Sequence, residues 1–213
     1  MTGTEDNTRK RLLDQAERLF AEKGYAGTSV REITAAAECN VAGVNYHFGS
    51  KQGLYMAVFQ ERWASRAMRL QQGFAAALAG LQDPGLSDVI AAMARAFLEG
   101  PWTDEERRNH IQLMQRELSD PGQALGMIVE NVMRPYIREV KKLIRACLRR
   151  EVDDEQLEIY ILSMLGVVLY FFLARPAVTE ILHRKYDQDF KSDLVAHITA
   201  FCLNGIEALN QEK

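Results

Sequence analysis

The stretch TSVREITAAAECNVAGVNYHFGSK, residues 28–51, decides the fold because it predicts two short helices joined by a tight turn. Ser29 and Glu32 have the spacing of a capping box, in which the hydroxyl and the carboxylate satisfy free backbone amides at a helix start. A first helix is therefore expected from about Val30, and Asn40 is placed to cap a second one. Together the two segments predict a helix-turn-helix motif.

The second of these helices, residues 41–46, has little side-chain bulk. Ala42 and Gly43 present almost no side chain, so the helix can approach another backbone or the floor of a DNA major groove, which is wide enough for one helix. Val44 and Phe48 are expected to face the protein core. The stretch therefore has a surface suited to nucleic-acid contact.

Composition restricts where such a contact is made. The chain has 213 residues, of which 47% are hydrophobic and 26% are charged, as is ordinary for a folded protein. Its formal net charge is −3, so the molecule as a whole is not a polycation. Residues 1–62 carry eight basic and eight acidic side chains. The fold itself must therefore bring the basic groups together.

Helical periodicity dominates the rest of the chain, and no Val/Ile/Thr-rich alternating run is present, so the sequence predicts an all-α fold. The expected helices lie before Gly24 and at residues 51–79, 86–99, 104–118, 123–149, 154–174 and 189–210. Pro135 removes a backbone amide from the helix that contains it, so we expect a kink or break there. Ile111, Met114 and Leu118 form the expected apolar stripe of the helix at 104–118.

Several short motifs together resemble a known family. They are Gly24-Tyr25, Thr28-Ser29, Arg31-Glu32-Ile33, Ala36-Ala37, the run from Val44 to Lys51, and Gly53-Leu54. No pair of them is diagnostic, but their joint order resembles the DNA-binding domain of TetR-type transcriptional regulators. Residues 110–144 resemble the C-terminal domain of the CecR-like branch. Glu38 departs from the family, which usually has glycine at this turn; because a non-glycine residue in a left-handed turn costs on the order of 1 to 2 kcal/mol, we expect a slightly different turn.

The resemblance implies an N-terminal helix-turn-helix domain of three helices at residues 1–50 and a C-terminal helical ligand-binding and dimerisation bundle at residues 51–213. The candidate DNA contacts are Thr28, Ser29, Arg31, Val41, Ala42, Gly43, Asn45, Tyr46, His47 and Lys51. Asn45 can bond adenine edges, and small apolar groups can meet a thymine methyl. Lys51, at a helix start, suits a DNA phosphate. Arg31 can reach a base or phosphate, unless it pairs with a neighbouring glutamate.

Other candidates also have structural interpretations. Lys51 could be a solvated surface lysine, and Tyr46 and His47 could be half-buried wedges that stabilise the short helix. Thr28 and Ser29 are helix caps first and phosphate ligands second. We favour phosphate contact for Lys51 and Tyr46 and leave His47 open.

Methionine and aromatic side chains in the body of the chain are candidates for the lining of a pliable apolar cavity. The ligand-binding candidates are Met93, Phe97, Met114, Arg116, Met127, Met133, Tyr136 and Tyr170. Core packing is the alternative for each apolar one, and an ion pair is the alternative for Arg116. We expect a largely apolar small molecule, with Arg116 favouring an anionic or polar end and Pro135 acting as a hinge.

Further features concern cofactors, membranes and compartment. Three widely spaced cysteines and four scattered histidines argue against a disulfide framework and a structural zinc site, so we expect a reducing cytoplasm and no metal or other cofactor. The apolar run at 159–173 is shorter than the roughly 18 to 20 residues of a membrane span, so a buried helix and no membrane partner are expected. We expect no catalytic residues, since Glu180 and His183 are only half of a di-iron pattern.

The resemblance therefore implies a cytoplasmic homodimer that represses transcription from an inverted-repeat operator in double-stranded DNA and is released by a small-molecule effector. The helices at 154–174 and 189–210 are expected to form the dimer, because the first is apolar nearly all round. Two alternatives stay open: a helical dimerisation or adaptor protein without DNA binding and, with less support, a helical-bundle metal enzyme. Salt-dependent DNA binding distinguishes the first and metal analysis the second.

Overall fold

The computed structural model describes residues 2–207, with the backbone alone for residues 2–5 and 207. This part of the chain is helical and contains no strand, which confirms the all-α fold. The helices form two compact units, the first containing the chain up to residue 67 together with 102–132, and the second containing 68–101 and the chain from 133 onward. The functional boundary near residue 50 stays a prediction, because compactness and function need not divide a chain at the same place.

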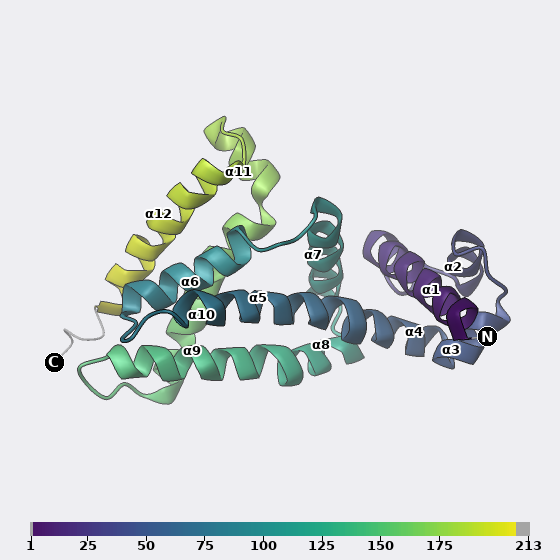
Figure 1. Ribbon diagram of the computed structural model, residues 1–213, viewed down its shortest axis with the longest axis horizontal. Helices are drawn as coiled ribbons and strands as arrows, with labels where there is room; N and C mark the ends of the chain where they lie inside the picture. Colours follow the sequence, from purple (N-terminus) through teal and green to yellow (C-terminus); the bar gives the residue numbers. More distant parts are fainter. Residues whose placement is uncertain (1, 208–213) are drawn as a thin grey trace. The chain divides into compact units, whose positions relative to one another are not determined.

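The first unit is built around α1 (Thr2–Lys23), which packs against α2 (Val30–Ala36), α3 (Ala42–Phe48), α4 (Lys51–Val58) and α7 (Asp104–Ser119) (Figure 1). The apolar stripe of α1, which includes Leu12 and Phe20, is buried. α1 ends where Gly24 takes a left-handed conformation, with φ of 75°. α1 is therefore the common support of the two helices of the helix-turn-helix.

α2 begins with the predicted capping box. The Ser29 hydroxyl accepts a hydrogen bond from the Glu32 amide at 3.2 Å, and the Glu32 carboxylate accepts one from the Ser29 amide at 2.8 Å. The Lys23 ammonium donates to the same carboxylate at 2.9 Å. The Asn40 side chain accepts from the Ala42 amide at 2.9 Å, so it caps α3 as expected.

The turn between α2 and α3 keeps a left-handed residue although that residue is a glutamate. Glu38 has φ of 51°, and its side chain is exposed. The Cys39 amide donates to the Thr34 carbonyl at 2.9 Å and closes the turn. The backbone therefore carries the steric strain of a Cβ at this position, with no burial of the side chain to offset it.

The helix expected at residues 51–79 contains a π-helical turn. α4 is followed by η1 (Phe59–Trp63) and then by α5 (Ala64–Leu78). Phe59 and Trp63 are both buried in the first unit. Because a π turn holds more residues than an α turn, it rotates the residues that follow around the helix axis. Hydrophobic spacing did not indicate this turn.

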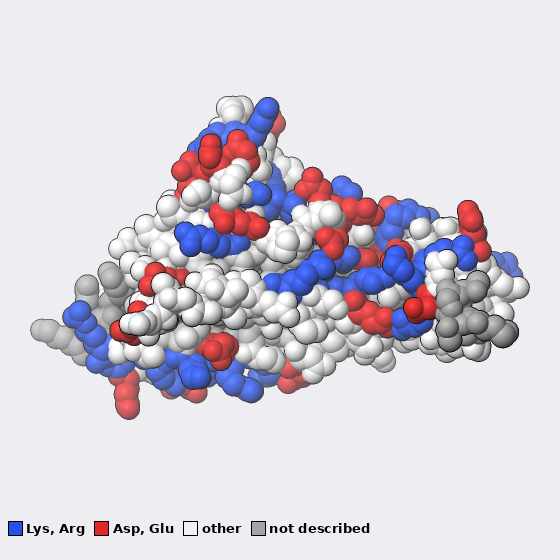
Figure 2. All heavy atoms as spheres, viewed as in Figure 1, with Lys and Arg blue, Asp and Glu red and all other residues white. Residues whose placement is uncertain are grey.

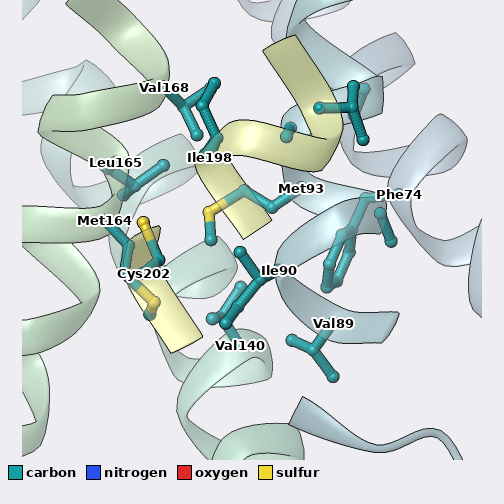
Figure 3. Close-up of a cluster of buried hydrophobic side chains, with 14 of the residues drawn as sticks. Phe74, Val89, Ile90, Met93, Val140, Met164, Leu165, Val168, Ile198 and Cys202 are labelled. Atoms are coloured by element: carbon teal, nitrogen blue, oxygen red, sulfur yellow. The ribbon is translucent and has the colours of Figure 1, made fainter. Parts of the chain in front are cut away.

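The second unit is centred on α6 (Leu86–Leu98), which packs against α9 (Arg134–Cys147), α10 (Asp154–Leu173) and α12 (Gln188–Glu207). Figure 3 shows Ile90 and Met93 of α6 in one cluster with Val168 of α10 and Ile198 of α12. These side chains have no exposed surface. α10 is followed by α11 (Arg175–Leu182), which has Pro176 in its first turn. Positions 208–210, predicted as helix, lie outside the described residues.

The apolar stripe predicted for α7 is wrong. Ile111 and Met114 are only half-buried, and Leu118 is 60% exposed. The side chains that α7 buries are Asn109, His110, Leu113 and Glu117. Three of these four are polar, so a search for apolar periodicity selects the wrong face of the helix.

The helix predicted at 123–149 is divided near Pro135, as expected. It consists of α8 (Gln123–Ile128), the π turn η2 (Val129–Met133) and α9. Pro135 lies in the first turn of α9 and directly follows the π turn. Proline lacks the amide that an α-helix would use and clashes with the preceding turn, and the wider π turn accommodates both effects.

α10 is less buried than predicted. Asp153 caps it by accepting from the amides of Glu155 and Gln156. Only 33% of its most apolar window is buried, since Ile159 and Tyr170 are more than half exposed. Among the described helices it alone has the length and composition of a membrane span, a test that core helices of soluble proteins also pass. Its exposed apolar side is not covered by the other residues that the structure describes.

We expect Glu38→Gly to stabilise the protein. Glycine removes the strain of a left-handed non-glycine residue but adds flexibility to the unfolded chain, so the net gain should be about 0.5 to 1 kcal/mol. Urea unfolding followed by circular dichroism measures it. Glu38→Ala keeps the Cβ and should be close to wild type; equal stability of the Gly and Ala variants would contradict strain at this turn.

The carboxyl of Glu32 should titrate far below its usual range. The Lys23 ammonium first, and then the Ser29 amide, lower the pKa of Glu32 from 4.5 to about 2. The stabilisation by this capping box is therefore complete above about pH 4.5 and is lost as the pH falls through about 2. A carbon NMR titration of the carboxyl measures the pKa, which should rise in Lys23→Ala. Lys10→Ala, which removes a surface ammonium bonded to Asp14, should leave it unchanged.

Candidate DNA-binding surface

α3 and the residue before it present one exposed face. Tyr46 is 73% exposed and Val41 is 45% exposed. Ala42 and Asn45 are exposed as well. Positions 41, 42, 45 and 46 share one side of a helix because residues three to four apart lie above one another. This side offers an amide, a phenol and small apolar groups to a groove.

Gly43 belongs to the packed side of α3. A Cβ on Gly43 would lie 3.5 Å from Cδ1 of Leu12, which is fully buried in α1. The small residue therefore brings α3 close to α1 and does not face outward with the base-contact candidates. Val44 is fully buried, as predicted. His47 is half-buried with its ring edge-on to Tyr46 at 4.8 Å, so both interpretations of His47 stay open.

Thr28 is a structural residue. Its side chain is 1% exposed, and its hydroxyl lies 2.8 Å from the Gly24 carbonyl and 3.1 Å from the Leu19 carbonyl. A buried hydroxyl that is bonded to the end of α1 has no path to a phosphate, so we remove Thr28 from the candidate DNA contacts. Ser29 is exposed, although its hydroxyl already serves the capping box.

Arg31 keeps its charge available. It is exposed and, among the residues described, it forms no ion pair. Glu32, the glutamate next to it, is bound by Lys23 instead. The intrahelical pair considered as an alternative for Arg31 is therefore not the observed arrangement.

Lys51 lies at the start of α4, as predicted. Ser50 caps this helix by accepting from the Gly53 amide at 3.0 Å. The ammonium of Lys51 lies 4.2 Å from the centroid of the Tyr25 ring, which identifies a cation–π contact. The lysine is half-buried, so its position is more restricted than that of a fully solvated side chain.

Ion pairs attach α1 to the helix that follows α3. Arg66 and Glu17 form a pair in which both residues are nearly fully buried. Arg9 and Glu61 are bonded at 2.5 Å, and this bond lowers the pKa of the Glu61 carboxyl. The Arg9 guanidinium also lies 5.1 Å from the ring centroid of Phe48, the last residue of α3. α1 is therefore attached through side chains to the end of α3, to η1 and to the start of α5.

The candidate ligand-binding residues fall in both units: Met114, Arg116 and Met127 in the first, and Met93, Phe97, Met133, Tyr136 and Tyr170 in the second. Met93 is in the packed core of Figure 3, whereas Tyr170 is 53% exposed. The Tyr136 hydroxyl is buried without a hydrogen-bond partner in the described structure. Burial raises the pKa of this hydroxyl. Its lack of a partner marks a polar site inside an apolar environment.

Arg116 has a different role from the one predicted. Its Nε donates to the Ala21 carbonyl at 2.9 Å, and its Nη2 donates to the Glu22 carbonyl. These carbonyls belong to the last turn of α1, where the helix dipole favours a positive charge. Arg116 therefore caps α1 and is not available to orient a ligand.

The buried carboxylate of Glu117 joins three helices of the first unit. It accepts a hydrogen bond from the Tyr55 hydroxyl at 2.6 Å and from the amides of Gly122 and Leu125 at 3.1 and 2.9 Å. Burial raises the pKa of the Tyr55 hydroxyl, and its hydrogen bond to Glu117 raises it further. The sequence offers one signal for this role of Glu117, which is the Asp120-Pro121-Gly122 turn. A new helix begins after that turn, and its first free amides need a hydrogen-bond acceptor.

His110 lies between both tryptophans of the chain. Its ring is stacked on Trp63 at 4.3 Å and is edge-on to Trp102 at 4.5 Å. Burial, and secondly the charge of Arg66, lower the pKa of His110 well below its usual range. His110 is therefore neutral at pH 7 and acts in packing. No group of three or more potential metal ligands is found in the described part of the chain.

Basic side chains also gather on α9, outside the helix-turn-helix (Figure 2). Arg138, Lys141, Lys142 and Arg145 line a shallow groove there. Lys141 is bonded to Asp154 and Glu158, and Arg145 is bonded to Asp154 as well. Part of this positive charge is thus neutralised within the second unit.

Two family models match the chain. Residues 12–58 match the tetR family of bacterial regulatory proteins. Residues 86–206, more than half of the chain, match the C-terminal domain of the HTH-type transcriptional dual regulator CecR. The two matches cover the helix-turn-helix and most of the helical body.

Among curated relatives, the transcriptional dual regulator CecR of Shigella flexneri is 26% identical, over 84% of this chain and 81% of its own length. The repressor AcnR of Corynebacterium glutamicum is 35% identical over 71% of this chain and 69% of its own. The repressor NicS of Pseudomonas putida is 25% identical over 94% and 93%. These proteins are named as transcriptional regulators and not as enzymes.

Solved structures show the same fold at lower identity. HlyIIR, a hemolysin II transcriptional regulator, has a TM-score of 0.61 at 20% identity and covers 92% of this chain and 97% of its own. A transcriptional regulator from Rhodococcus sp. Rha1 has a TM-score of 0.62 at 16% identity, with coverage of 92% and 96%. The predicted resemblance is thereby confirmed, and the chain belongs to the TetR family of bacterial DNA-binding transcriptional regulators, with a C-terminal domain of the CecR type.

Proposed function

We propose that the protein is a homodimeric repressor that binds an inverted-repeat operator through α3 and is released by a small, largely apolar molecule. The observation that carries this proposal is the exposed face of Val41, Ala42, Asn45 and Tyr46 on a helix seated closely on α1. Arg31 adds an exposed guanidinium without an ion pair in the described structure. The relatives named as repressors agree with this sign of regulation.

The apolar face shared by α10 and α12 is the proposed dimer contact. Its residues line a shallow groove: Ile159, Tyr160, Ser163, Met164, Val167, Phe201, Cys202 and Gly205. Phe201 is 61% exposed, and a Cβ added at Gly205 would extend into open space. A large exposed apolar patch is favourably covered by a second copy, and a glycine lets two helices approach closely.

A two-fold dimer explains how one chain reads an inverted repeat. Its two copies of α3 would enter successive major grooves, roughly 34 to 36 Å apart. An effector that binds better to a dimer with another spacing shifts the population away from the operator-bound form. The effector therefore acts through its differential affinity for the two conformations.

The proposed effector site lies in the second unit. Phe97 is half-buried and lies edge-on to Phe172 at 5.7 Å, and the buried Tyr136 hydroxyl offers a hydrogen bond to a polar atom of the effector. Pro135, next to the π turn η2, is the proposed hinge. We withdraw the preference for an anionic end, since it rested on Arg116. The proposed compartment is the cytoplasm, where DNA is accessible and the free cysteines stay reduced.

The DNA-binding prediction concerns two residues with different roles. Lys51→Ala should weaken binding to all sequences alike and lower the slope of log affinity against log salt by roughly one, because one phosphate contact is lost. Asn45→Ala should change base preference at one position of each half-site. Selection from random DNA followed by gel-shift titration over a salt series measures both effects.

The control is Lys142→Ala, which removes an exposed lysine of α9 in the second unit and should change neither affinity nor slope. Failure of the wild-type protein to select any sequence would contradict operator binding and favour the adaptor alternative. An unchanged salt slope in Lys51→Ala would remove this lysine from the interface.

The dimer prediction uses Phe201→Glu, which places a charge on the proposed contact. It should give monomers in light scattering and abolish operator binding, because an unpaired charge in an apolar interface costs several kcal/mol. Leu118→Glu is the matched control, since Leu118 is equally exposed, at 60%, but lies on α7. A dimer that survives Phe201→Glu would locate the interface elsewhere.

A further inference from the structure

Lys51 is held by an aromatic ring. Its ammonium lies 4.2 Å from the ring centroid of Tyr25, and it forms no ion pair among the described residues. A lysine side chain has four rotatable bonds and otherwise samples many positions. Fixing it at the moment of binding costs conformational entropy. The Tyr25 ring thus restricts the lysine before DNA is present.

Tyr25 is itself fixed by other rings. It is 37% exposed, with its ring stacked near Phe20 at 6.1 Å and edge-on to Tyr55 at 5.0 Å. Phe20 and Tyr55 also meet edge to face at 4.9 Å. Three aromatic rings from α1, from the turn after it and from α4 therefore contact one another, and only Tyr25 reaches the surface.

The inner end of this aromatic group is attached to α7. Tyr55 is buried, and its hydroxyl donates to the Glu117 carboxylate at 2.6 Å. The neighbouring Arg116 bonds the last turn of α1. A Cβ on Gly24 would lie 3.0 Å from Nη1 of Arg116, so the glycine before Tyr25 leaves space for the guanidinium. α7 therefore holds both the ring that supports Tyr25 and the turn that carries it.

We propose that Tyr25 is a positioning residue for DNA binding, which places the Lys51 ammonium for a phosphate and is itself held by Tyr55 and Glu117. The inference rests on the proposed operator binding and deepens it. Residues of α7 then influence DNA affinity without touching DNA. Tyr25 fixes the position of the Lys51 charge but adds no charge itself. Its substitution should therefore change DNA affinity without changing the salt slope, whereas substitution of Lys51 changes both.

The experiment is a double-mutant cycle of Tyr25→Leu and Lys51→Ala on the full chain, with operator affinity measured over a salt series. Tyr25→Leu should weaken binding about two- to five-fold, the range that a cation–π contact at a partly exposed site supports, with an unchanged salt slope. In the Lys51→Ala background the same substitution should have almost no effect. An equal loss in both backgrounds would show that Tyr25 acts through the fold and would overturn the proposal.

Two further variants test separately the ring of Tyr25 and the hydroxyl of Tyr55. Tyr25→Phe keeps the ring face and should bind DNA like wild type; a loss equal to that of Tyr25→Leu would overturn the role of the ring. Tyr55→Phe removes only the hydroxyl that reaches Glu117, and it should weaken binding in the presence of Lys51 and not in Lys51→Ala. Equal effects in both backgrounds would remove α7 from the proposal.

A measurement without DNA separates this proposal from operator binding itself. The ε-methylene protons of Lys51 should be shifted upfield by the Tyr25 ring in proton NMR, and they should lose this shift in Tyr25→Leu and keep it in Tyr25→Phe. A ring shift in a protein that binds no operator would preserve the contact and reject the proposed function. The absence of a ring shift in wild type would reject the contact, whether or not DNA binds. Should Tyr25→Leu fail to fold, the Phe variant and the wild-type spectrum still decide.

Discussion

Helices of seven residues are not stable alone in water, because a few hydrogen bonds do not repay the entropy of forming the first turn. α2 and α3 both have this length, so their positions depend on packing against α1. Val44 is buried in this contact, and Gly43 lets α3 come close to Leu12. The exposed residues of α3 thus have a defined direction only because α1 holds the opposite side. Movement of α1 would therefore also move the candidate DNA-binding surface.

Several charged side chains of the first unit form ion pairs within that unit. Glu17, Glu32 and Glu61 each bind a basic side chain of the same unit. Arg31 and Lys51 form no ion pair among the described residues and remain available to a phosphate. Residues 1–62, which carry eight acidic and eight basic side chains, can therefore present positive charge at a defined place. A protein of this kind gains specificity from position, since its net charge of −3 gives no general attraction to DNA.

The second unit leaves apolar surface uncovered in a single chain. α6 is enclosed by α9, α10 and α12, while α10 and α12 both keep large apolar side chains outside. Burial of such surface is the main favourable term in association, so the same helices that close the core with one side favour a second copy with the other. The length and composition of α10 resemble those of a membrane span for this reason. An effector that repacks this unit would alter the surface of the proposed dimer contact.

Local rules predicted the features that neighbouring residues determine. The capping box of Ser29 and Glu32, the glycine end of α1, the interruption near Pro135 and the family motifs could all be read from the sequence, because each depends on residues within a few positions of one another. The all-α fold followed from helical periodicity, whereas Gly43, which was predicted to face DNA, lies on the packed side of α3.

Contacts between distant residues decided the rest. Arg116 was predicted to orient a ligand but caps α1, Thr28 was a candidate phosphate contact but is buried, and α7 buries polar residues where an apolar stripe was expected. Glu117 joins Tyr55 across 62 positions of sequence, and no pattern within α7 indicates this partner. The sequence by itself determined most helix starts and ends, because caps and breaks are local, but it did not indicate the π turn η1. Only the tertiary structure decided which polar side chains are buried and which face solvent, because the burial of a side chain depends on which helix packs against it.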